Sequence, residues 1–320
     1  STYPTGFEVF DINNGGATSL NILEDIGALG PALKGKKVVI SFTTDMFNDL
    51  EVPPKTYAGS FSQMHANALI FNQDLSLSLK QKIAKRMLDY PDTLTDPVLI
   101  FALQNLASGS AWNDFLYYLT VPLGKLEDLI IRLQDHYEVW SYINLHPQIN
   151  PNVTRNPRNI DWTALLAQAT AQQKAATSSN PYGIENDAWN KNYHGYLRVH
   201  KPGSSNQKFL TAINNSKEWY DLELELEVLQ ELGVRPLIMS RPVNGGLFTA
   251  NGVTPEVQAV YYSRLEKLVS TYHMPLMDFK GYTNDPYFSI DEAAHTGREG
   301  WVVIDQTLDA FFHGKLSVEH

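Results

Sequence analysis

The sequence has no cysteine among its 320 residues. This absence excludes disulfide bonds, thiolate metal sites and a cysteine nucleophile. The nine histidines are scattered along the chain, and none stands in an H-x-x-x-H pattern or another metal-binding motif. We therefore expect neither a metal site nor any other cofactor.

Long apolar runs are also missing. The most apolar windows, residues 96–112 and 115–124, are too short or are interrupted by Gln, Asn and Pro, so the sequence predicts no membrane-spanning helix. The chain opens on a turn-like STYPTG, which does not have the pattern of a secretory signal peptide. It also has no initiator methionine, and we expect the natural protein to begin upstream of residue 1.

Positively charged residues are fewer than negatively charged ones. There are 25 Lys and Arg against 35 Asp and Glu, which gives a formal net charge of -10 at pH 7. Sequence-independent binding of nucleic acid needs Lys and Arg to neutralise phosphates, so this charge argues against nucleic acid as a partner. The 43% of hydrophobic residues suffices for a packed core, and the length fits one large α/β domain or a domain with an insertion.

Strand and helix patterns alternate at both ends of the chain. In the N-terminal part the expected elements are a buried strand at 7–13 (FEVFDIN), a helix from about Thr18 to Leu29 ended by Gly30, and a strand at 35–47. From residue 216 onward they are a helix at 220–233, a strand at 234–242, a helix at 255–272, a strand at 274–279 and a closing helix at 298–312. Such alternation is typical of a parallel sheet covered by helices.

The middle of the chain breaks this alternation. Between Ser60 and Ile143 apolar residues recur at helical spacing, which predicts three to five helices. Two polar segments rich in Pro and Asn follow, separated by a short helix at 162–177. The sequence thus predicts one domain over residues 1–320, with a sheet core at 7–57 and 216–315, a helical insertion at about 58–145, and a polar loop and short-helix region at about 146–215.

A candidate base lies just beyond the last predicted strand. His295 follows an acidic pair, Asp291 and Glu292, and Thr296 and Glu299 have the spacing of a capping box at the start of the closing helix. Open α/β sheets bind ligands beyond the carboxyl ends of their strands, and a carboxylate near a histidine can fix its tautomer. An exposed acidic loop with an incidental histidine is the alternative interpretation.

Small and polar residues follow the first two predicted strands. Asn14, Gly15 and Gly16 in the NNGG segment would let backbone N–H groups approach a ligand or an oxyanion. An ordinary tight turn is the commoner explanation of such a segment. Thr44 and Asp45 end the second strand, where Asp45 either orients a substrate or caps the next segment.

Two further features have both a functional and an ordinary interpretation. GSS at 203–205 resembles the start of a serine-nucleophile motif, but its position in a polar loop favours a flexible turn. The aromatic cluster WNDFLYYL at 112–119 favours packing within the helical insertion, with contact to a membrane surface or a partner as the alternative.

With these segments in place, the sequence resembles the D-alanyl transfer protein family, DltD, nearly from end to end. The resemblance is carried by the order and spacing of FDINNGGATSL, IGALGPALKGKKVVISFT, FNQDLSLSLKQKIAKRMLDYP, LGKLEDLIIRLQDHYEVW, NPYGIENDAWN, EWYDLELELEVLQELGVRPLIMSRPVNG and DPYFSIDEAAHTGREGW. It implies a three-layer SGNH-hydrolase-like (flavodoxin-like) parallel sheet with a large helical insertion. In that family a serine in a Gly-Ser-Ser-Glu-like turn follows the first strand, and an acid and a histidine near the C-terminus complete the triad.

The resemblance assigns the histidine and leaves the acid open. His295 matches the histidine of the family, and Gly15 and Gly16 match a turn that helps to form the oxyanion hole. The acid of the family usually stands three residues before the histidine, where this chain has Glu292, while Asp291 is one residue further away. Either carboxylate can serve.

Two departures from the family pattern concern the substrate and the nucleophile. Thr44 and Asp45 stand where the family has a Pro-Gln pair. The serine turn, the first strand and an N-terminal membrane helix would all precede residue 7, where only STYPTG is found. We therefore expect His295 to serve a serine that lies upstream of this chain, and we expect the 320 residues alone to be inactive.

The resemblance implies acyl (D-alanyl) transfer to teichoic acids at the extracytoplasmic face of the cell membrane, through a seryl ester. The implied partners are a membrane-embedded acyltransferase and the acyl carrier of the D-alanylation system, with teichoic acid as the acceptor. One alternative is a non-catalytic scaffold that holds a carrier or a teichoic acid, which the absent serine favours for the chain as given. Another is an SGNH-type polysaccharide O-acyl esterase.

Overall fold

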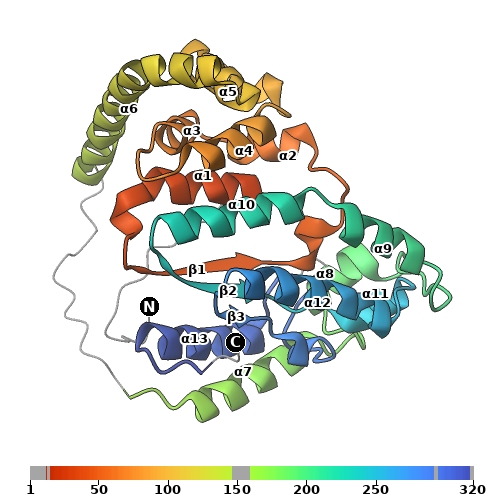
Figure 1. The fold of residues 1–320 in the computed structure, drawn as a ribbon. Helices are drawn as coiled ribbons and strands as arrows, with labels where there is room; N and C mark the ends of the chain where they lie inside the picture. Colours follow the sequence, from red (N-terminus) through yellow and green to blue (C-terminus); the bar gives the residue numbers. More distant parts are fainter. Residues whose placement is uncertain (1–11, 13–14, 146–158, 292–294, 318–320) are drawn as a thin grey trace.

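Three parallel strands form the centre of the computed structural model (Figure 1). The residues that the structure describes are 12, 15–145, 159–291 and 295–317. The strands, in spatial order, are β1 (Lys37–Phe42), β2 (Arg235–Ser240) and β3 (Leu276–Met277). Val39 pairs with Leu237 and Ile238 pairs with Leu276, both in parallel register. All three strands therefore end at the same edge of the sheet, and the α/β class expected from the sequence is confirmed.

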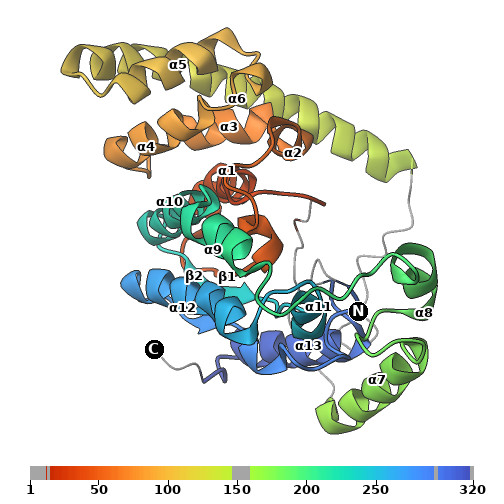
Figure 2. The ribbon, with the colours of Figure 1, turned by 90° about the vertical axis from the view of Figure 1, so that its right-hand side faces the viewer.

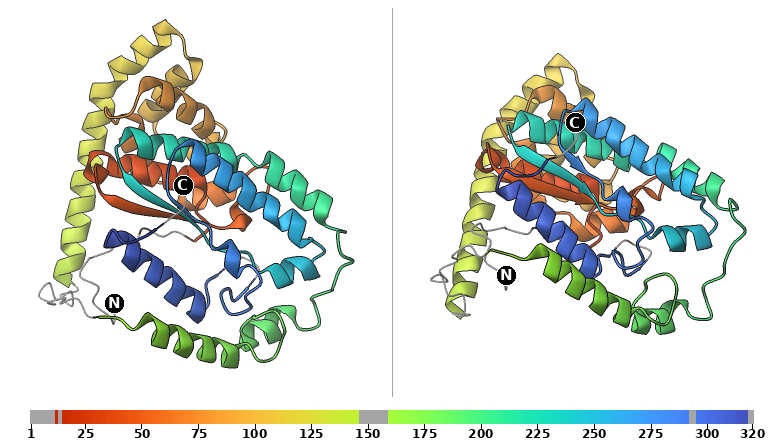
Figure 3. Two further views of the ribbon diagram at one scale, coloured as in Figure 1. Left: turned by 60° about the horizontal axis from the view of Figure 1, so that its bottom comes forward. Right: turned by 90° about the horizontal axis from the view of Figure 1, so that it is seen from below.

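Helices cover both faces of the sheet (Figure 2). Because side chains alternate along a strand, Ile238 and Met239 point to opposite faces. Ile238 joins a core cluster with residues of α1 (Ser19–Leu29), α10 (Glu218–Glu231) and α12 (Pro255–Thr271). Met239 joins a smaller cluster with α13 (Arg298–Phe312), and α7 (Trp162–Ala176) packs along the outer side of α13 (Figure 3).

The helical insertion stacks on the side of α1 that faces away from the sheet (Figure 1). It consists of α2 (Pro54–Ser60), α3 (Gln63–Ile70), α4 (Leu77–Met87), α5 (Pro97–Ser108) and α6 (Ala111–Leu145). The remaining helical segments are η1 (Gly30–Leu33), η2 (Thr44–Phe47), η3 (Pro91–Thr93), α8 (Asn186–Ala188), η4 (Trp189–Tyr193), α9 (Asn206–Asn215), α11 (Gly245–Ala250) and η5 (Lys280–Tyr282). In the described part of the chain, no helix is both long enough and apolar enough to cross a membrane.

Local sequence signals explain the two helices that support the sheet. Thr18 caps α1 with its side-chain oxygen, Asn21 accepts from the backbone of Thr18 in return, and Gly30 follows the last residue of the helix. In α10 the leucines at 222, 226 and 229 are buried, and Gly233 has a φ of +64° just beyond the helix end. The predicted helix at 220–233 is thus confirmed, despite the alternation of Leu and Glu that also suits a strand.

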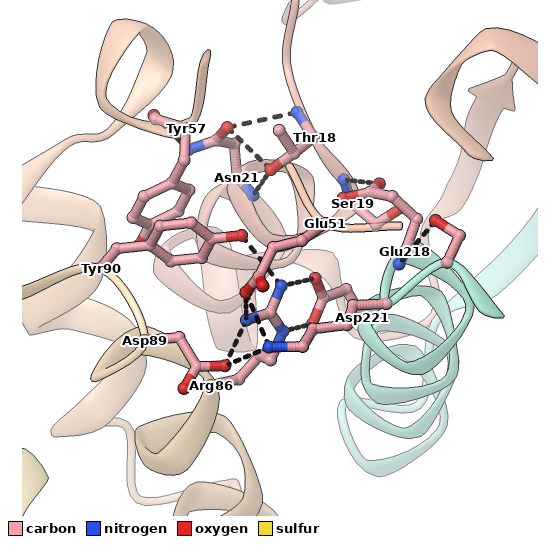
Figure 4. Close-up of polar contacts among 12 residues, drawn as sticks. Thr18, Ser19, Asn21, Glu51, Tyr57, Arg86, Asp89, Tyr90, Glu218 and Asp221 are labelled. Atoms are coloured by element: carbon pink, nitrogen blue, oxygen red, sulfur yellow. Dashed lines mark hydrogen bonds and ion pairs between the residues drawn. The ribbon is translucent and has the colours of Figure 1, made fainter. Parts of the chain in front are cut away.

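A buried ionic cluster joins the insertion to the sheet layer (Figure 4). Nε of Arg86, on α4, donates to Asp221 on α10 at 2.8 Å, and the rest of the guanidinium donates to Asp221, Asp89 and Tyr90 at 3.1, 2.6 and 2.9 Å. Close by, the hydroxyl of Tyr57 donates to Glu24. The insertion is therefore tied to α1 and α10 by polar contacts as well as by apolar packing.

Several predictions for the C-terminal half need correction. Helices α9 and α11 were not predicted, because both are short and lie among polar, turn-forming residues. The strand expected at 274–279 is reduced to two residues. The capping box of Thr296 and Glu299 is wrong: a bridge between Ser289 and Thr296 keeps Thr296 extended, and Gly297 becomes the N-cap of α13.

Other predictions are not tested. Apart from Ile12, the strand expected at 7–13 lies outside the described residues. The assignment of residues 1–320 to a single domain also stays a prediction.

Candidate active site

His295 lies on the chain that leads from β3 to α13, at the carboxyl edge of the sheet. Two backbone hydrogen bonds hold the base of this segment: the N–H of Ile290 donates to the carbonyl of His295 at 2.8 Å, and the N–H of Gly297 donates to that of Phe288 at 2.7 Å. The side chain of Phe288 is fully buried. The backbone of Ile290, His295 and Gly297 is therefore tied to the core.

Asp291 holds the imidazole of His295. Its Oδ2 lies 2.5 Å from Nδ1 of His295, and its Oδ1 accepts from the backbone N–H of the same residue at 3.1 Å. A carboxylate in this position requires the proton to be on Nδ1, which leaves the lone pair on Nε2. Nε2 has no partner among the described residues, and 66% of the His295 side chain is exposed. The arrangement suits a base that accepts a proton from a group arriving from outside.

Two other histidines also pair with an aspartate, so pairing alone does not identify a site. Nδ1 of His65 lies 2.6 Å from Asp25 between α3 and α1, and Nδ1 of His313 lies 3.2 Å from Asp309 at the end of α13. Neither follows a strand. Position at the strand ends, where open α/β sheets bind ligands, distinguishes His295.

A cation that the sequence analysis missed lies at the same edge. Arg241 directly follows β2, and its backbone N–H donates to the carbonyl of Phe42 at the end of β1, at 3.0 Å. Burial lowers the pKa of Arg241, and the carboxylates of Asp291 and Asp45 oppose this effect. Its Nε is buried and has no hydrogen-bond partner in the described part of the chain. An arginine immediately after an apolar strand is the signal that could have revealed it.

Thr44 and Asp45 extend the edge beyond β1. Thr44 is 1% exposed, and its Oγ1 has no hydrogen-bond partner among the described residues. Asp45 accepts from the side-chain amide of Asn48 at 3.0 Å within η2. The segments that follow β1, β2 and β3 thus bring Asp45, Arg241 and Asp291 to one edge of the sheet. The predicted parallel sheet required this position for Asp45 and Asp291.

The other candidates are placed less fully. Asn14 and Glu292 lie outside the described residues. Gly15 and Gly16 are exposed, and a Cβ on either would meet nothing within 4 Å; Gly16 has a φ of +80°. These glycines are open to a ligand, but the structure describes no contact between them and His295. Their role in an oxyanion hole stays a prediction.

The GSS turn belongs to a different part of the molecule. The hydroxyl of Ser205 donates to the carbonyl of Asn251 at 2.6 Å, and Ser204 packs against Gly252. Both contacts tie the turn to the segment between α11 and α12. Neither serine is in contact with His295 in the described part of the chain, which agrees with the interpretation of GSS as an ordinary turn.

The fold and the edge define an α/β protein with a histidine–aspartate pair and a partly buried arginine at the carboxyl ends of a parallel sheet. The chain belongs to the DltD protein family, whose model matches residues 1–313. It is 25% identical to Protein DltD of Bacillus subtilis (strain 168) over 315 residues, which are 98% of this chain and 77% of that protein. It is also 22% identical to Protein DltD of Staphylococcus aureus (strain NCTC 8325 / PS 47), over 98% of this chain and 75% of that protein. A third relative, Protein DltD of Lacticaseibacillus rhamnosus, is 22% identical over 97% of this chain and 71% of that protein.

Proposed function

We propose that this protein transfers acyl groups in the D-alanylation of teichoic acids, and that His295 is its general base. Membership of the DltD family supports the process. The observation that carries the chemistry is the double contact of Asp291 with Nδ1 and the backbone N–H of His295, which leaves Nε2 open at the strand ends. A base held in one tautomer and facing outward is the arrangement that proton transfer to and from a substrate needs.

The proposed reaction runs through a seryl ester. Nε2 of His295 accepts the proton of a serine hydroxyl while the serine oxygen attacks the acyl carbonyl. His295 then donates this proton to the leaving group. In the second half the hydroxyl of the acceptor loses its proton to His295 and its oxygen takes the acyl group, while His295 returns that proton to the departing serine oxygen, which frees the serine. Throughout, the carboxylate of Asp291 stabilises the imidazolium that forms after each proton transfer.

We propose that the serine lies N-terminal to residue 1. The family places it in a Gly-Ser-Ser-Glu-like turn, and the GSS at 203–205 continues with Asn206 and is bonded to Asn251. For the acid we favour Asp291 over Glu292, because Asp291 has the required contacts with His295.

The remaining residues of the edge fit roles around the acyl group. Arg241 offers an unused buried N–H donor close to Asp291, which suits an oxyanion or a phosphate of the substrate. Gly15 and Gly16, with Asn14, are proposed to supply backbone donors to the oxyanion, and Thr44 and Asp45 to position the substrate. These roles depend on the proposed acyl transfer, and a result that contradicts the transfer also contradicts them.

The wider setting is proposed from the family. We propose a single SGNH-hydrolase-like domain with the helical insertion described above, at the extracytoplasmic face of the cell membrane and anchored by an N-terminal membrane helix. Its partners would be the membrane-embedded acyltransferase and the acyl carrier of the D-alanylation system.

A fluorophosphonate probe, which reacts with serines activated by a base, tests the proposal. The protein in its natural length should gain one probe in its intact mass, His313→Ala should gain one as well, and His295→Ala should gain none. Labelling that is independent of His295 would contradict the proposal. The 320-residue chain is expected to stay unlabelled.

A non-catalytic scaffold is the second candidate, and one observation favours it: no serine of the described residues contacts His295. A scaffold predicts that the protein in its natural length resists the probe while still binding its carrier or teichoic acid. The labelling experiment therefore separates the two functions.

A further inference from the structure

Helix α6 has two apolar faces, and only one of them is packed. On the inner face Tyr117 is buried and its hydroxyl donates to the carbonyl of Ile70 at 2.8 Å. About two helical turns further on, Gly124 lies against the ring of Phe71. A Cβ added to Gly124 would come within 2.1 Å of that ring. These contacts fix α6 to α3 and to the residue that follows it.

The opposite side of α6 carries large apolar side chains that are exposed in the part of the chain that the structure describes. Ten of them are each between 48% and 68% exposed: Trp112, Phe115, Tyr118, Leu119, Leu123, Leu126, Leu129, Ile130, Leu133 and Tyr137. We call these ten residues the outer face of α6. The expectation that the aromatic cluster at 112–119 packs within the insertion is thus wrong for Trp112, Phe115 and Tyr118, and right for Tyr117.

The outer face is broad, long and uncharged. At 100° per residue the ten side chains cover an arc of about 140°, and at 1.5 Å per residue they extend over roughly 38 Å. The sequence places no Asp, Glu, Lys or Arg within this arc, although the whole chain has a net charge of -10. Such a continuous exposed apolar strip is unusual for a surface that meets only water.

The charged residues of α6 lie outside the strip, and two of its acids, Asp114 and Asp128, make polar contacts. Asp114 accepts from the side-chain amide of Gln81 at 2.8 Å, and Asp128 accepts from Nε of Arg132 at 2.8 Å. Lys125 is exposed and, like Arg132, flanks the strip on the same side. On this side the border of the outer face therefore carries Lys125 and Arg132, and Arg132 is paired with Asp128.

We propose that the outer face of α6 lies on a lipid bilayer, parallel to its surface. The helix is not apolar enough to cross a membrane, so it would rest at the interface. Trp112, Tyr118 and Tyr137 are side chains of the kind that favour this zone, since each has an apolar body and a polar group. Lys125 at the border suits anionic headgroups.

A second copy of this chain is the competing occupant. Pairing of two helices covers a narrow seam with apolar residues at every third and fourth position, and an arc of about 140° is wider than one partner helix covers. Pro122 also lies within α6, on the same side as the outer face. The apolar interior of a bilayer can cover the whole arc, and it does not require a straight, regular partner helix.

Flotation of the 320-residue chain with vesicles tests the proposal. One set of vesicles is phosphatidylcholine, and the other contains phosphatidylglycerol in equal part. The wild type should float with both sets, and the variant Leu126→Glu/Leu133→Glu should lose at least about tenfold in lipid partitioning, because charges replace two leucines that would be buried in lipid. The matched control is Tyr196→Glu/Val199→Glu, which puts the same charges on two side chains that are 75% and 73% exposed away from α6 and should float as the wild type does.

Two flotation results would overturn the proposal: a wild type that does not float with either set, or a Leu126→Glu/Leu133→Glu variant that floats as well as the wild type. A third contradicting result is a dimeric wild type and a monomeric variant, as measured by light scattering. Both leucines are more than half exposed, so the variant is expected to fold, and circular dichroism checks this. The inference goes beyond acyl transfer and uses none of the residues at the strand ends.

Discussion

Arg86 and Arg241 are both largely removed from water, yet the chain treats the two guanidinium groups in opposite ways. Arg86 is 4% exposed, and every nitrogen of its guanidinium donates to a carboxylate or a hydroxyl within 3.1 Å (Figure 4). Although burial lowers the pKa of Arg86, the Asp221 carboxylate beside it raises that pKa overall. Arg241 instead has a buried Nε without a partner among the described residues, and burial lowers its pKa.

The difference indicates two uses of a buried cation. A guanidinium whose donors are all taken fixes the elements that supply the acceptors, here α4 and α10. A guanidinium with a donor unused costs stability and is retained where a ligand completes it. We therefore assign Arg86 to the structure of the insertion and Arg241 to the site.

Replacing Arg86 should give the largest effect on stability. Arg86→Met leaves the buried carboxylate of Asp221 without its cation, so we expect a loss of about 3–5 kcal/mol in the free energy of unfolding, measured by urea denaturation. The control is Arg132→Met, which breaks the exposed pair with Asp128 and should cost less than about 1 kcal/mol. Equal, small losses from both variants would show that the ionic cluster does not hold the insertion.

Removing the charge of Asp291 should give the next largest effect, this time on rate. Asp291→Asn alters the partner of Nδ1 of His295, and we expect fluorophosphonate labelling of the natural-length protein to slow by about a hundredfold or more. Asp309→Asn, beside His313, should leave the rate unchanged. A large loss from Glu292→Gln with little from Asp291→Asn would reassign the acid.

Arg241→Gln should separate binding from stability. Because Arg241 makes no ion pair with the residues that the structure describes, the free energy of unfolding should change by less than about 1 kcal/mol. Soluble poly(glycerol phosphate) should protect the wild type from the probe, and the variant should need about tenfold more polymer for the same protection, since a charged hydrogen bond is lost. If the variant is strongly destabilised but needs no more polymer than the wild type for protection, Arg241 has a structural role, as Arg86 does.

The pH dependence of stability should show the smallest effect and concerns Glu225, a buried acid of α10. Burial raises the pKa of Glu225 well above its ordinary value of 4.5, and neighbouring Glu218 and Asp25 raise it further. A raised pKa means that the folded state binds the proton more tightly than the unfolded state, so this contribution is full below about pH 4.5 and is lost as the pH rises toward the folded value.

Thermal unfolding of Glu225→Gln against the wild type measures this contribution. The Tm of the variant relative to the wild type should rise as the pH increases above about 4.5, because only the wild type has a carboxyl group that loses its proton on unfolding, and a rising pH favours that loss. Asp49→Asn, at an exposed carboxylate, serves as the control and should give a constant difference in Tm. A constant difference for Glu225→Gln as well would mean that this group does not titrate with unfolding.

Local patterns were sufficient for the elements that position the site. Gly30 predicted the end of α1, and three leucines on one helical stripe, at 222, 226 and 229, predicted α10. The alternation of strands and helices predicted that Asp45 and His295 would both lie at the carboxyl edge of a parallel sheet, where the structure has them.

The features that could not be predicted depend on contacts between distant segments. The surroundings of Arg241 include the backbone carbonyl of Phe42 and the carboxylate of Asp291, which are far away in the sequence. Glu218 and Glu225 would point to water on an isolated amphipathic helix, but the packing of α1 and the insertion over α10 buries them. Likewise, the periodicity of α6 shows that it has apolar faces but not which of them remains uncovered.

The most direct test of the central claim is the D-alanine ester content of teichoic acid in cells that produce the natural-length protein with His295→Ala, measured as D-alanine released by mild alkali. The account predicts a fall to the level of cells without the protein, while His313→Ala, at the other histidine paired with an aspartate near the C-terminus, keeps the wild-type content at equal protein abundance. Wild-type ester content in the His295→Ala cells would contradict the assignment of His295 as the catalytic base.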